Sequence, residues 1–399
     1  MRVTLLNVKY SPNLGDGVIA ECLEAGLRKH LPGSVVESCD LAGRRAYGTG
    51  LNKSRELVIN ALSALPKPLR RICTNAILRY MISTRLKTHY EAALVDQDAV
   101  VLGGGQLLAD ADLNFPLKIN AALNQARLAD AIIVVHGVGV SNYWSDKGRQ
   151  LFLDVLGENA QHVGVRDERS KAHWLDHFED APDAIVGDPG LLAEQVYGPM
   201  PRSQSSSPRI GLGVVHPKTI KLHADERGSG ATNYSDLFCD VACQIADSGR
   251  NVVMFTNGAF DDGVFADRLR RRIEKSLNLN DRISFAPQPK TPRDLVQLIA
   301  SFDGVIAHRL HANIVAYAYG VPHVGLGWDT KVQSFLASVG RSKFAISAQN
   351  QNPDAIMGAL EAALSEPISE EARAAIAAEC EQDIVRLADK LCSFSRVSA

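Results

Sequence analysis

The sequence predicts an α/β protein of two domains, each built on a parallel β-sheet. The chain has 399 residues, which is too long for one ordinary hydrophobic core. Short apolar runs alternate with stretches of helical periodicity through both halves. Several of these runs end in glycine, as expected where a buried parallel strand turns into its connecting helix.

The first half alternates strands and helices up to residue 196. We expect strands at 3–8, 35–39, 98–102, 131–136, 162–166 and 184–186. We expect helices at 18–31, 118–129 and 146–157. Together they form a first domain over 1–196.

Residues 197–208 are rich in Pro and Ser and have the composition of a linker. Strands are then expected at 210–215, 251–256, 283–286, 304–307 and 323–326, with helices at 234–248, 263–277, 292–301 and 312–319. A second domain therefore covers 209–352, and the alanine-rich remainder, 353–399, is expected to be helical.

The composition is typical of a globular chain, and its positive and negative charges nearly balance. Hydrophobic residues make up 46% and charged residues 22%, and the net charge of −2 argues against general nucleic-acid binding. Seven cysteines show no CxxC or Cys/His zinc spacing, so we expect reduced thiols and no metal site. Neither a signal peptide nor a transmembrane run is predicted, and the expected location is cytoplasmic.

Residues 51–90 differ from the rest of the first domain. They contain eight Lys/Arg and a single acid, Glu56, among Leu, Ile and Ala at helical spacing. Pro66 and Pro68 are expected to divide the stretch into two helices. A solvated helical hairpin is one interpretation. The other is a docking surface for anionic lipid or a lipid-linked diphosphate, which would place the protein peripherally at the inner face of the membrane.

Ligands of open parallel sheets bind beyond the carboxyl ends of the strands, so the residues that follow each strand are the site candidates. Glycine there lets the backbone approach a ligand, and the N–H groups of the next helix favour phosphate or carboxylate. A structural turn is the alternative for any single glycine. The loop residues expected at the site are Asn13, Gly15, Gly103, Gly104, Gly105, Gly137 and Gly139.

The run His308-Arg-Leu-His311 follows the apolar strand 304–307 and is the most informative local pattern. Arg309 needs an anionic partner there, because a buried unpaired guanidinium is costly. A protein carboxylate meets that need, and so does a phosphate or carboxylate ligand. His311 suits either acid–base catalysis or a structural role at the helix start. Lys331, after a later strand, would add positive charge to the same cleft.

Several of these runs form a longer ordered pattern. In order they are Asn13-Leu-Gly-Asp16, Gly103-Gly-Gly105, Gly137-Val-Gly139, Arg166-Asp-Glu-Arg-Ser170, Gly187-Asp188, Arg309-Leu-His311, Ala316-Tyr-Ala-Tyr-Gly-Val-Pro322 and Lys331. The set resembles the polysaccharide pyruvyl transferase family and spans most of the chain. Residues 51–90 and the C-terminal helices lie outside the resemblance. His308 stands where family members often have serine.

The resemblance implies two Rossmann-like domains in a glycosyltransferase-B-like architecture, the first on the acceptor side and the second on the donor side. It implies transfer of pyruvate from phosphoenolpyruvate onto two hydroxyls of a sugar as a cyclic ketal, with release of phosphate. The acceptor would belong to a polysaccharide or a lipid-linked oligosaccharide. Phosphoenolpyruvate is then a co-substrate, and no cofactor or metal is required. The family's Arg-x-His motif maps onto Arg309, Leu310 and His311, and its Arg-Asp-x-x-Ser motif places Arg166 at the donor.

Phosphoenolpyruvate carries up to three negative charges, so we expect Arg309, Arg166 and Lys331 to bind it. His311 would exchange the proton or stabilise the departing phosphate, and Asp16 or Asp188 would orient or deprotonate the acceptor. Helix capping is the alternative for both aspartates. Two other functions stay open. One is a nucleotide-sugar glycosyltransferase, for which the region before Lys331 offers Asp329 but no paired glutamates. The other is a non-catalytic protein that binds an anionic glycan.

Overall fold

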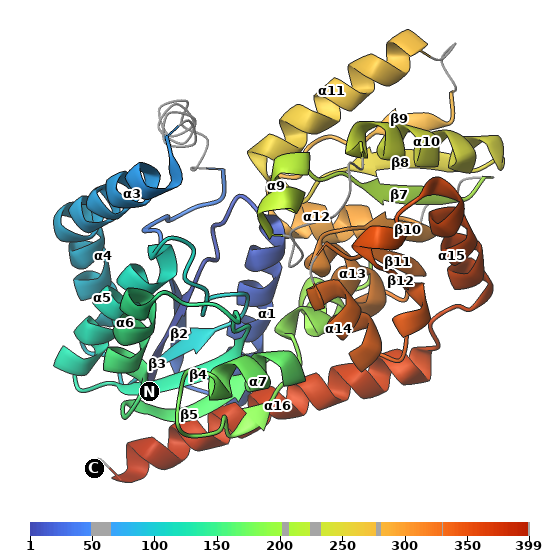
Figure 1. Cartoon of the computed structure of the whole chain (residues 1–399). Helices are drawn as coiled ribbons and strands as arrows, with labels where there is room; N and C mark the ends of the chain where they lie inside the picture. Colours follow the sequence, from blue (N-terminus) through green and yellow to red (C-terminus); the bar gives the residue numbers. More distant parts are fainter. Residues whose placement is uncertain (49–64, 202–206, 224–232, 277–280, 329, 398–399) are drawn as a thin grey trace. The chain divides into compact units, whose positions relative to one another are not determined.

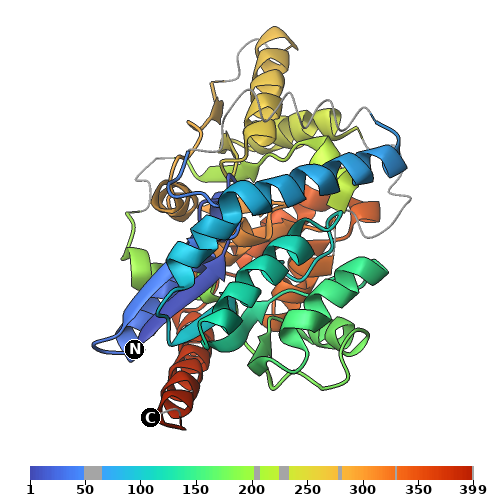
Figure 2. The same cartoon turned by 90° about the vertical axis from the view of Figure 1, so that its left-hand side faces the viewer.

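The computed structural model describes residues 1–48, 65–201, 207–223, 233–276, 281–328 and 330–397. The start of the predicted insert (51–64), part of the predicted linker (202–206) and Asp329 lie outside these residues. The described chain forms two sheets of six strands each, and every strand pair is parallel (Figure 1, Figure 2). The predicted fold class, two α/β domains with parallel sheets, is confirmed. No helix among the described residues is long and apolar enough to span a bilayer.

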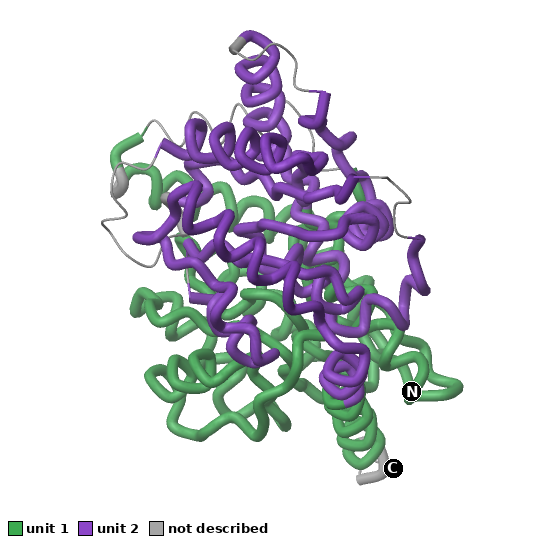
Figure 3. Tube along the Cα trace, turned by 90° about the vertical axis from the view of Figure 1, so that its right-hand side faces the viewer, with its two compact units in different colours: residues 1–11, 19–189, 379–399 green, residues 12–18, 190–378 purple. Residues whose placement is uncertain are grey.

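Contacts divide the chain into two compact units (Figure 3). Unit 1 comprises residues 1–11, 19–189 and 379–399, and unit 2 comprises residues 12–18 and 190–378. We predicted the boundary within 197–208, whereas this division changes units between 189 and 190. The last helix, α16 (Glu370–Val397), contributes to both units and contains the change at 378/379.

The sheet of unit 1 has the order β2-β1-β3-β4-β5-β6. Its strands are β1 (Arg2–Asn7), β2 (Val35–Asp40), β3 (Ala99–Gly103), β4 (Ile132–Val138), β5 (Ala160–Val165) and β6 (Ala184–Ile185). Every residue of β3 and β4 is buried, as expected for central strands covered on both faces. The strand order reverses direction at β1, so the crevice between the ends of β1 and β3 is the switch point where such sheets bind ligands.

Helices of unit 1 cover this sheet. They are α1 (Leu14–His30), α3 (Lys67–Met81), the π-helical turn η1 (Ile82–Leu86), α4 (Lys87–Leu94), α5 (Asn114–Leu128), α6 (Asp146–Leu156) and α7 (Glu168–Leu175). Tyr90, Leu123 and Phe152, from α4, α5 and α6, share one core with the strands. Helix α1 packs against α16, where the backbone of Gly26 faces the side chain of Ile384.

Several helices begin earlier than the sequence predicted, among them α1 and α5 of unit 1. Helix α1 begins at Leu14 rather than at residue 18, because the run Asn13-Leu-Gly-Asp16 itself forms the first turn. Helix α5 begins at Asn114 rather than at residue 118. Pro66 is the N-cap of α3, so the second helix of the predicted pair begins where the prolines placed it, and the first would lie outside the described residues.

The sheet of unit 2 has the order β12-β11-β10-β7-β8-β9. Its strands are β7 (Arg209–Gly213), β8 (Asn251–Phe255), β9 (Ile283–Phe285), β10 (Gly304–Ala307), β11 (His323–Leu326) and β12 (Ala345–Ile346). Its helices are α8 (Ala193–Tyr197), α9 (Pro217–His223), α10 (Tyr234–Asp247), α11 (Phe260–Ser276), α12 (Pro292–Ala300), α13 (Leu310–Ala318), α14 (Thr330–Ser338) and α15 (Pro353–Ser365), with the 3₁₀ turns η2 (Pro189–Leu192), η3 (Ser342–Phe344) and η4 (Ala348–Asn350). Here the order reverses at β7, so the switch point lies between the ends of β7 and β10.

Candidate active site

Arg309 lies two residues after the end of β10 and is the N-cap residue of α13. Its guanidinium donates from Nη2 to Oδ2 of Asp262 at 2.6 Å, and its central carbon lies 5.5 Å from the centre of the Trp328 ring. The Asp262 side chain is fully buried and that of Arg309 is 16% exposed. Of the two partners that the sequence left open, the structure therefore supplies a protein carboxylate.

Asp262 joins the two strand ends at the switch point of unit 2. Its Oδ1 accepts the backbone N–H of His216, which follows β7, at 2.8 Å, while Oδ2 accepts from Arg309 after β10. One buried carboxylate thus fixes the guanidinium against the neighbouring strand end. The sequence prediction missed Asp262, since acidic residues in the first turn of a helix are common and Asp262 lies in that turn of α11.

His308 is fully buried behind Arg309. Its Nε2 lies 3.0 Å from Oε1 of Gln351, whose Nε2 donates to the carbonyl of Gly327 at 2.8 Å. Burial lowers the pKa of His308 to about 4, so the ring is neutral and Nε2 is the donor. His308 therefore ties the end of β10 to the loop after β11, and its ring packs near Trp328 at a centroid distance of 6.0 Å.

His311 lies in the first turn of α13 and is 8% exposed. It packs against Gly15 so closely that a Cβ added to Gly15 would lie 2.5 Å from the Cβ of His311. The backbone N–H of Leu14 donates to the carbonyl of Asn257, after β8, at 2.9 Å. The motif at 13–16 and the motif at 309–311 thus come together within unit 2, although the sequence placed the former in the first domain.

Asp16 and Asn13 contact each other in this turn. Nδ2 of Asn13 donates to Oδ1 of Asp16 at 3.3 Å, and the backbone N–H of Asp16 donates to the carbonyl of Asn13. A carboxylate in the first turn of a helix is stabilised by the helix dipole. The position of Asp16 fits this local role and also puts its partly exposed carboxylate one residue from the glycine that contacts His311.

Lys331 is the second residue of α14, the helix that follows β11. Since β11 is the neighbour of β10 in the sheet, the starts of α13 and α14 lie at the same carboxyl edge of unit 2. Leu310 occupies the first helical position of α13, between Arg309 and His311.

The remaining predicted site residues belong to unit 1. Gly104, Gly105 and Gly137 have φ values of 77°, 72° and 65°, a conformation that side chains rarely adopt, so these turns require glycine. Gly103 ends β3, and a Cβ there would meet Leu23 of α1 at 2.7 Å. Gly103 and Gly104 allow the end of β3 to pack closely against Leu23 and Ile19 of α1, which is the structural alternative that the sequence left open.

Arg166 lies at the end of β5, and its side chain is 8% exposed. Its Nε donates to Oδ2 of Asp167 at 3.2 Å, and its Nη2 donates to Oε1 of Gln106 at 3.3 Å. A Cβ on Gly139 would lie 2.4 Å from the same Gln106 oxygen, so this glycine leaves room for the Arg166 contact. Asp167 is the N-cap of α7 and accepts the N–H of Ser170 at 2.6 Å.

Asp188 is 5% exposed in unit 1. Its backbone carbonyl accepts from Sγ of Cys380 at 3.4 Å, and the N–H of Gly187 donates to Oδ2 of Asp383 at 2.7 Å. Both contacts attach the strand end at β6 to helix α16. The sequence did not connect these segments, because the C-terminal helices carried no motif.

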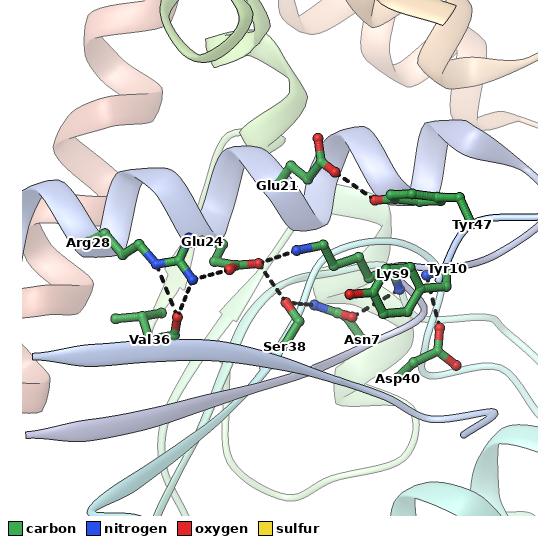
Figure 4. A network of polar contacts seen from close by, with 10 residues as sticks. All are labelled: Asn7, Lys9, Tyr10, Glu21, Glu24, Arg28, Val36, Ser38, Asp40 and Tyr47. Carbon is green, nitrogen blue, oxygen red and sulfur yellow. Dashed lines mark hydrogen bonds and ion pairs between the residues drawn. The ribbon is translucent and has the colours of Figure 1, made fainter. Parts of the chain in front are cut away.

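A polar network that the sequence prediction also missed fixes the ends of β1 and β2 to α1 (Figure 4). Glu24 of α1 is 5% exposed and accepts from Nζ of Lys9 at 2.6 Å and from Oγ of Ser38 at 3.0 Å, and Arg28 pairs with its other oxygen. A buried carboxylate with three donors is fully paired, so this network has the character of a structural anchor. Nearby, the hydroxyl of Tyr47 donates to Glu21 at 2.8 Å.

The geometry of unit 2 is suited to an anion and to proton transfer. A guanidinium, an imidazole and the N-terminus of α13 lie at one strand end, where backbone N–H groups and positive charge favour phosphate or carboxylate. Within the described parts of the chain, no group of three or more His, Cys, Asp or Glu side chains is arranged as a metal site.

The sequence model of the polysaccharide pyruvyl transferase family matches residues 13–330, which is more than half of the chain. The chain belongs to the polysaccharide pyruvyl transferase family. The match begins at Asn13 and ends just before Lys331, so it includes the first turn of α1 and the Arg309–His311 motif in this family member. Comparison with curated protein sequences gives no significant match.

Solved structures with the same fold include UDP-N-acetylglucosamine 2-epimerases. The enzyme from Methanocaldococcus jannaschii has 9% sequence identity and a TM-score of 0.56, over 97% of this chain and 99% of that chain. Another UDP-N-acetylglucosamine 2-epimerase has 12% identity and a TM-score of 0.56, over 100% of this chain and 96% of that chain. MnaA from S. aureus, in a structure with UDP, has 10% identity and a TM-score of 0.51, over 96% and 90% of the two chains. At such low identity these likenesses establish the glycosyltransferase-B-like fold of the family member and nothing about its substrates.

Proposed function

We propose that this protein transfers the pyruvyl group of phosphoenolpyruvate to a sugar of a polysaccharide or a lipid-linked oligosaccharide, forming a cyclic ketal and releasing phosphate. The observation that supports this most is the contact of the 13–16 turn with the Arg309–His311 turn in one unit. That contact joins the first and the last motif of a family match that runs over residues 13–330. It brings a cation, an imidazole and a partly exposed carboxylate into neighbouring turns.

Arg309 is proposed to bind the phosphate or carboxylate of the donor. Asp262 and the face of Trp328 hold the guanidinium in one orientation, and its Nε has no hydrogen-bond partner among the described residues. Because the Arg309–Asp262 pair is neutral in sum, a donor with up to three negative charges needs further positive charge. Lys331 and the N-terminus of α13 are proposed to supply it at the same edge of the sheet.

His311 is proposed to exchange the proton of the reaction. The methylene carbon of the donor takes up a proton, which leaves an oxocarbenium-like centre that one sugar hydroxyl attacks. The bond to the phosphate oxygen breaks, and a second hydroxyl closes the ketal. Of the two hydroxyl protons, one ends on the new methyl group and the other on the departing phosphate. Two carbon–oxygen bonds and one carbon–hydrogen bond form, while the carbon–phosphate oxygen bond and the π bond of the donor break, so the gain of oxygen at one carbon is balanced by the gain of hydrogen at its neighbour and no oxidant or reductant is consumed.

Asp16 is proposed to orient or deprotonate the acceptor in preference to Asp188. Asp16 is partly exposed and adjoins Gly15, which contacts His311 within unit 2. Asp188 is 5% exposed and lies in unit 1, where its main chain is bonded to α16. Arg166 is bonded to Asp167 and Gln106 within unit 1, and its role at the donor stays a prediction.

Phosphate release tests the proposal. The protein is incubated with bacterial oligosaccharide acceptors and either phosphoenolpyruvate or a panel of nucleotide sugars. We expect phosphate and a ketal methyl signal in equal amounts from phosphoenolpyruvate, and no transfer from nucleotide sugars. The variant Arg309→Lys should need more than about tenfold higher donor concentration, because lysine cannot form a bidentate fork. Transfer from a nucleotide sugar would refute the proposal, as would binding of donor and acceptor without turnover.

A further inference from the structure

Helix α3 turns apolar side chains away from the core of unit 1. Leu69, Ile72 and Tyr80 are 52%, 66% and 69% exposed, and with the exposed Ala76 they recur at i, i+3, i+7 and i+11. This spacing places the four side chains on one face of an α-helix. Figure 2 shows α3 on the outside of the helical layer of unit 1.

The opposite face of α3 attaches the helix to the protein. Leu78 is 7% exposed and packs with Leu113 and Leu117 beside α5. A helix at a solvated surface ordinarily puts polar residues outward, so a second apolar face on an anchored helix marks a surface that binds something.

Positive charge predominates in the segment that contains this face. Residues 65–94 contain six Lys/Arg and one acid, Glu91, in a chain whose net charge is −2. Arg79 borders the apolar stripe, whereas Arg71 lies nearer the anchoring face that carries Leu78; both arginines are exposed and make no ion pair with any described residue. Arg70 lies 3.8 Å from Asp112 and Lys87 lies 3.7 Å from Glu91, so both of those pairs are loose and solvent-exposed.

The geometry points to the outer face of α3 as a docking surface for a membrane that contains anionic lipid. Ile72, Leu69 and Tyr80 enter the interface between headgroups and acyl chains, Arg79 beside them meets the lipid phosphates, and Arg71 adds long-range attraction to the anionic surface. A helix with an apolar stripe and a basic border lies in the plane of such an interface. Charge complementarity favours lipid over a second copy of the chain, because two copies of this face would bring their arginines together.

Vesicle sedimentation with the full chain tests this surface. The probes are phosphatidylcholine vesicles with and without a fraction of phosphatidylglycerol, at low and high salt. We expect the protein to sediment with the anionic vesicles alone, and less so at high salt. The double variant Ile72→Asp/Tyr80→Asp should lower the vesicle affinity more than about tenfold. Its matched control is Leu128→Asp, since Leu128 is 80% exposed at the end of α5, and this control should bind like the parent.

The basic border has its own variant pair. Arg71→Gln/Arg79→Gln should weaken binding about fivefold per arginine removed, whereas Arg268→Gln/Arg271→Gln on α11 should not. Unchanged melting midpoints show that each variant is folded. Binding needs neither donor nor acceptor, so its outcome is independent of the proposed reaction.

Three results would overturn the inference. The first is that the parent protein fails to bind anionic vesicles, and the second is that Ile72→Asp/Tyr80→Asp binds them as tightly as the parent does. Alternatively, the parent is a dimer in sedimentation equilibrium, the double variant is a monomer, and neither binds vesicles. That last result would make the outer face of α3 an interface between copies.

Discussion

The contact between Gly15 and His311 offers a substitution whose effect can be worked out from distances. An alanine at residue 15 would place its methyl carbon 2.5 Å from Cβ of His311 and 2.7 Å from Cγ and Nδ1 of the ring. Ordinary contacts to a Cβ begin at 3.4 Å, so the two groups must move apart by about 0.9 Å. Because Gly15 is fixed in the first turn of α1, we expect the imidazole to take most of this shift.

The effect on stability combines two opposed contributions. Replacing glycine by alanine within a helix stabilises by about 0.5–1 kcal/mol, whereas overpacking a buried site costs about 1–3 kcal/mol. The free energy of unfolding of Gly15→Ala should therefore fall by no more than about 2.5 kcal/mol. Catalysis is more sensitive, because a misplacement of about 1 Å can cost about 100-fold in rate.

The assay measures phosphate release from phosphoenolpyruvate at saturating donor, together with urea unfolding. The matched control is Gly358→Ala in α15, where an added Cβ meets nothing within 4 Å. That control should gain about 0.5–1 kcal/mol of stability and keep its activity. If Gly15→Ala turns over within twofold of the parent, then catalysis does not depend on the placement of the His311 imidazole, and the reasoning is refuted.

Three further substitutions test individual contacts. Gln351→Leu leaves His308 Nε2 and the Gly327 carbonyl without their partner, so urea unfolding should show a loss of about 2–4 kcal/mol, and an unchanged midpoint would contradict the described bonding. Asp262→Asn removes the negative charge beside Arg309, so the free energy of unfolding should fall by about 2–3 kcal/mol. Calorimetry should also show weaker binding of phosphoenolpyruvate, and an affinity equal to that of the parent would show that Asp262 does not position the guanidinium. Burial lowers the pKa of His136 from 6.5 to about 3. Below pH 6.5 the unfolded chain is therefore protonated at this ring while the folded chain is not, and the free energy of unfolding falls by about 1.4 kcal/mol for each pH unit. His136→Leu should flatten that slope between neutral and mildly acidic pH, since neither ring nitrogen has a hydrogen-bond partner among the described residues, and an identical slope would show that His136 is not the titrating group.

The fold was predictable from the sequence because buried parallel strands carry strong local signals. Apolar runs such as 131–136 end in glycine and alternate with helical spacing, which defines the connectivity of both sheets. Contacts between distant segments have no such signal. No local pattern joins α16 to the end of β6, or the first turn of α1 to unit 2, because both contacts depend on tertiary packing.

The candidate site was predictable where a residue type needs a partner, and less so for the partner itself. An arginine after a buried strand required an anion, but Asp262 looks like any acid in a first helical turn. His308 had no decisive pattern, because its role rests on Gln351, which lies in an irregular segment before α15. The glycines of unit 1 have the pattern of ligand-binding turns, but their positive φ angles and close contacts already require several of them.

The central claim is that phosphoenolpyruvate binds at Arg309 beside His311, and a crystal structure of the protein with phosphoenolpyruvate tests it most directly. We predict a phosphate or carboxylate oxygen of the donor within hydrogen-bond distance of the Arg309 guanidinium, with His311 near the methylene carbon or the phosphate. A donor bound away from Arg309, with Arg309 still paired only to Asp262, would contradict the account.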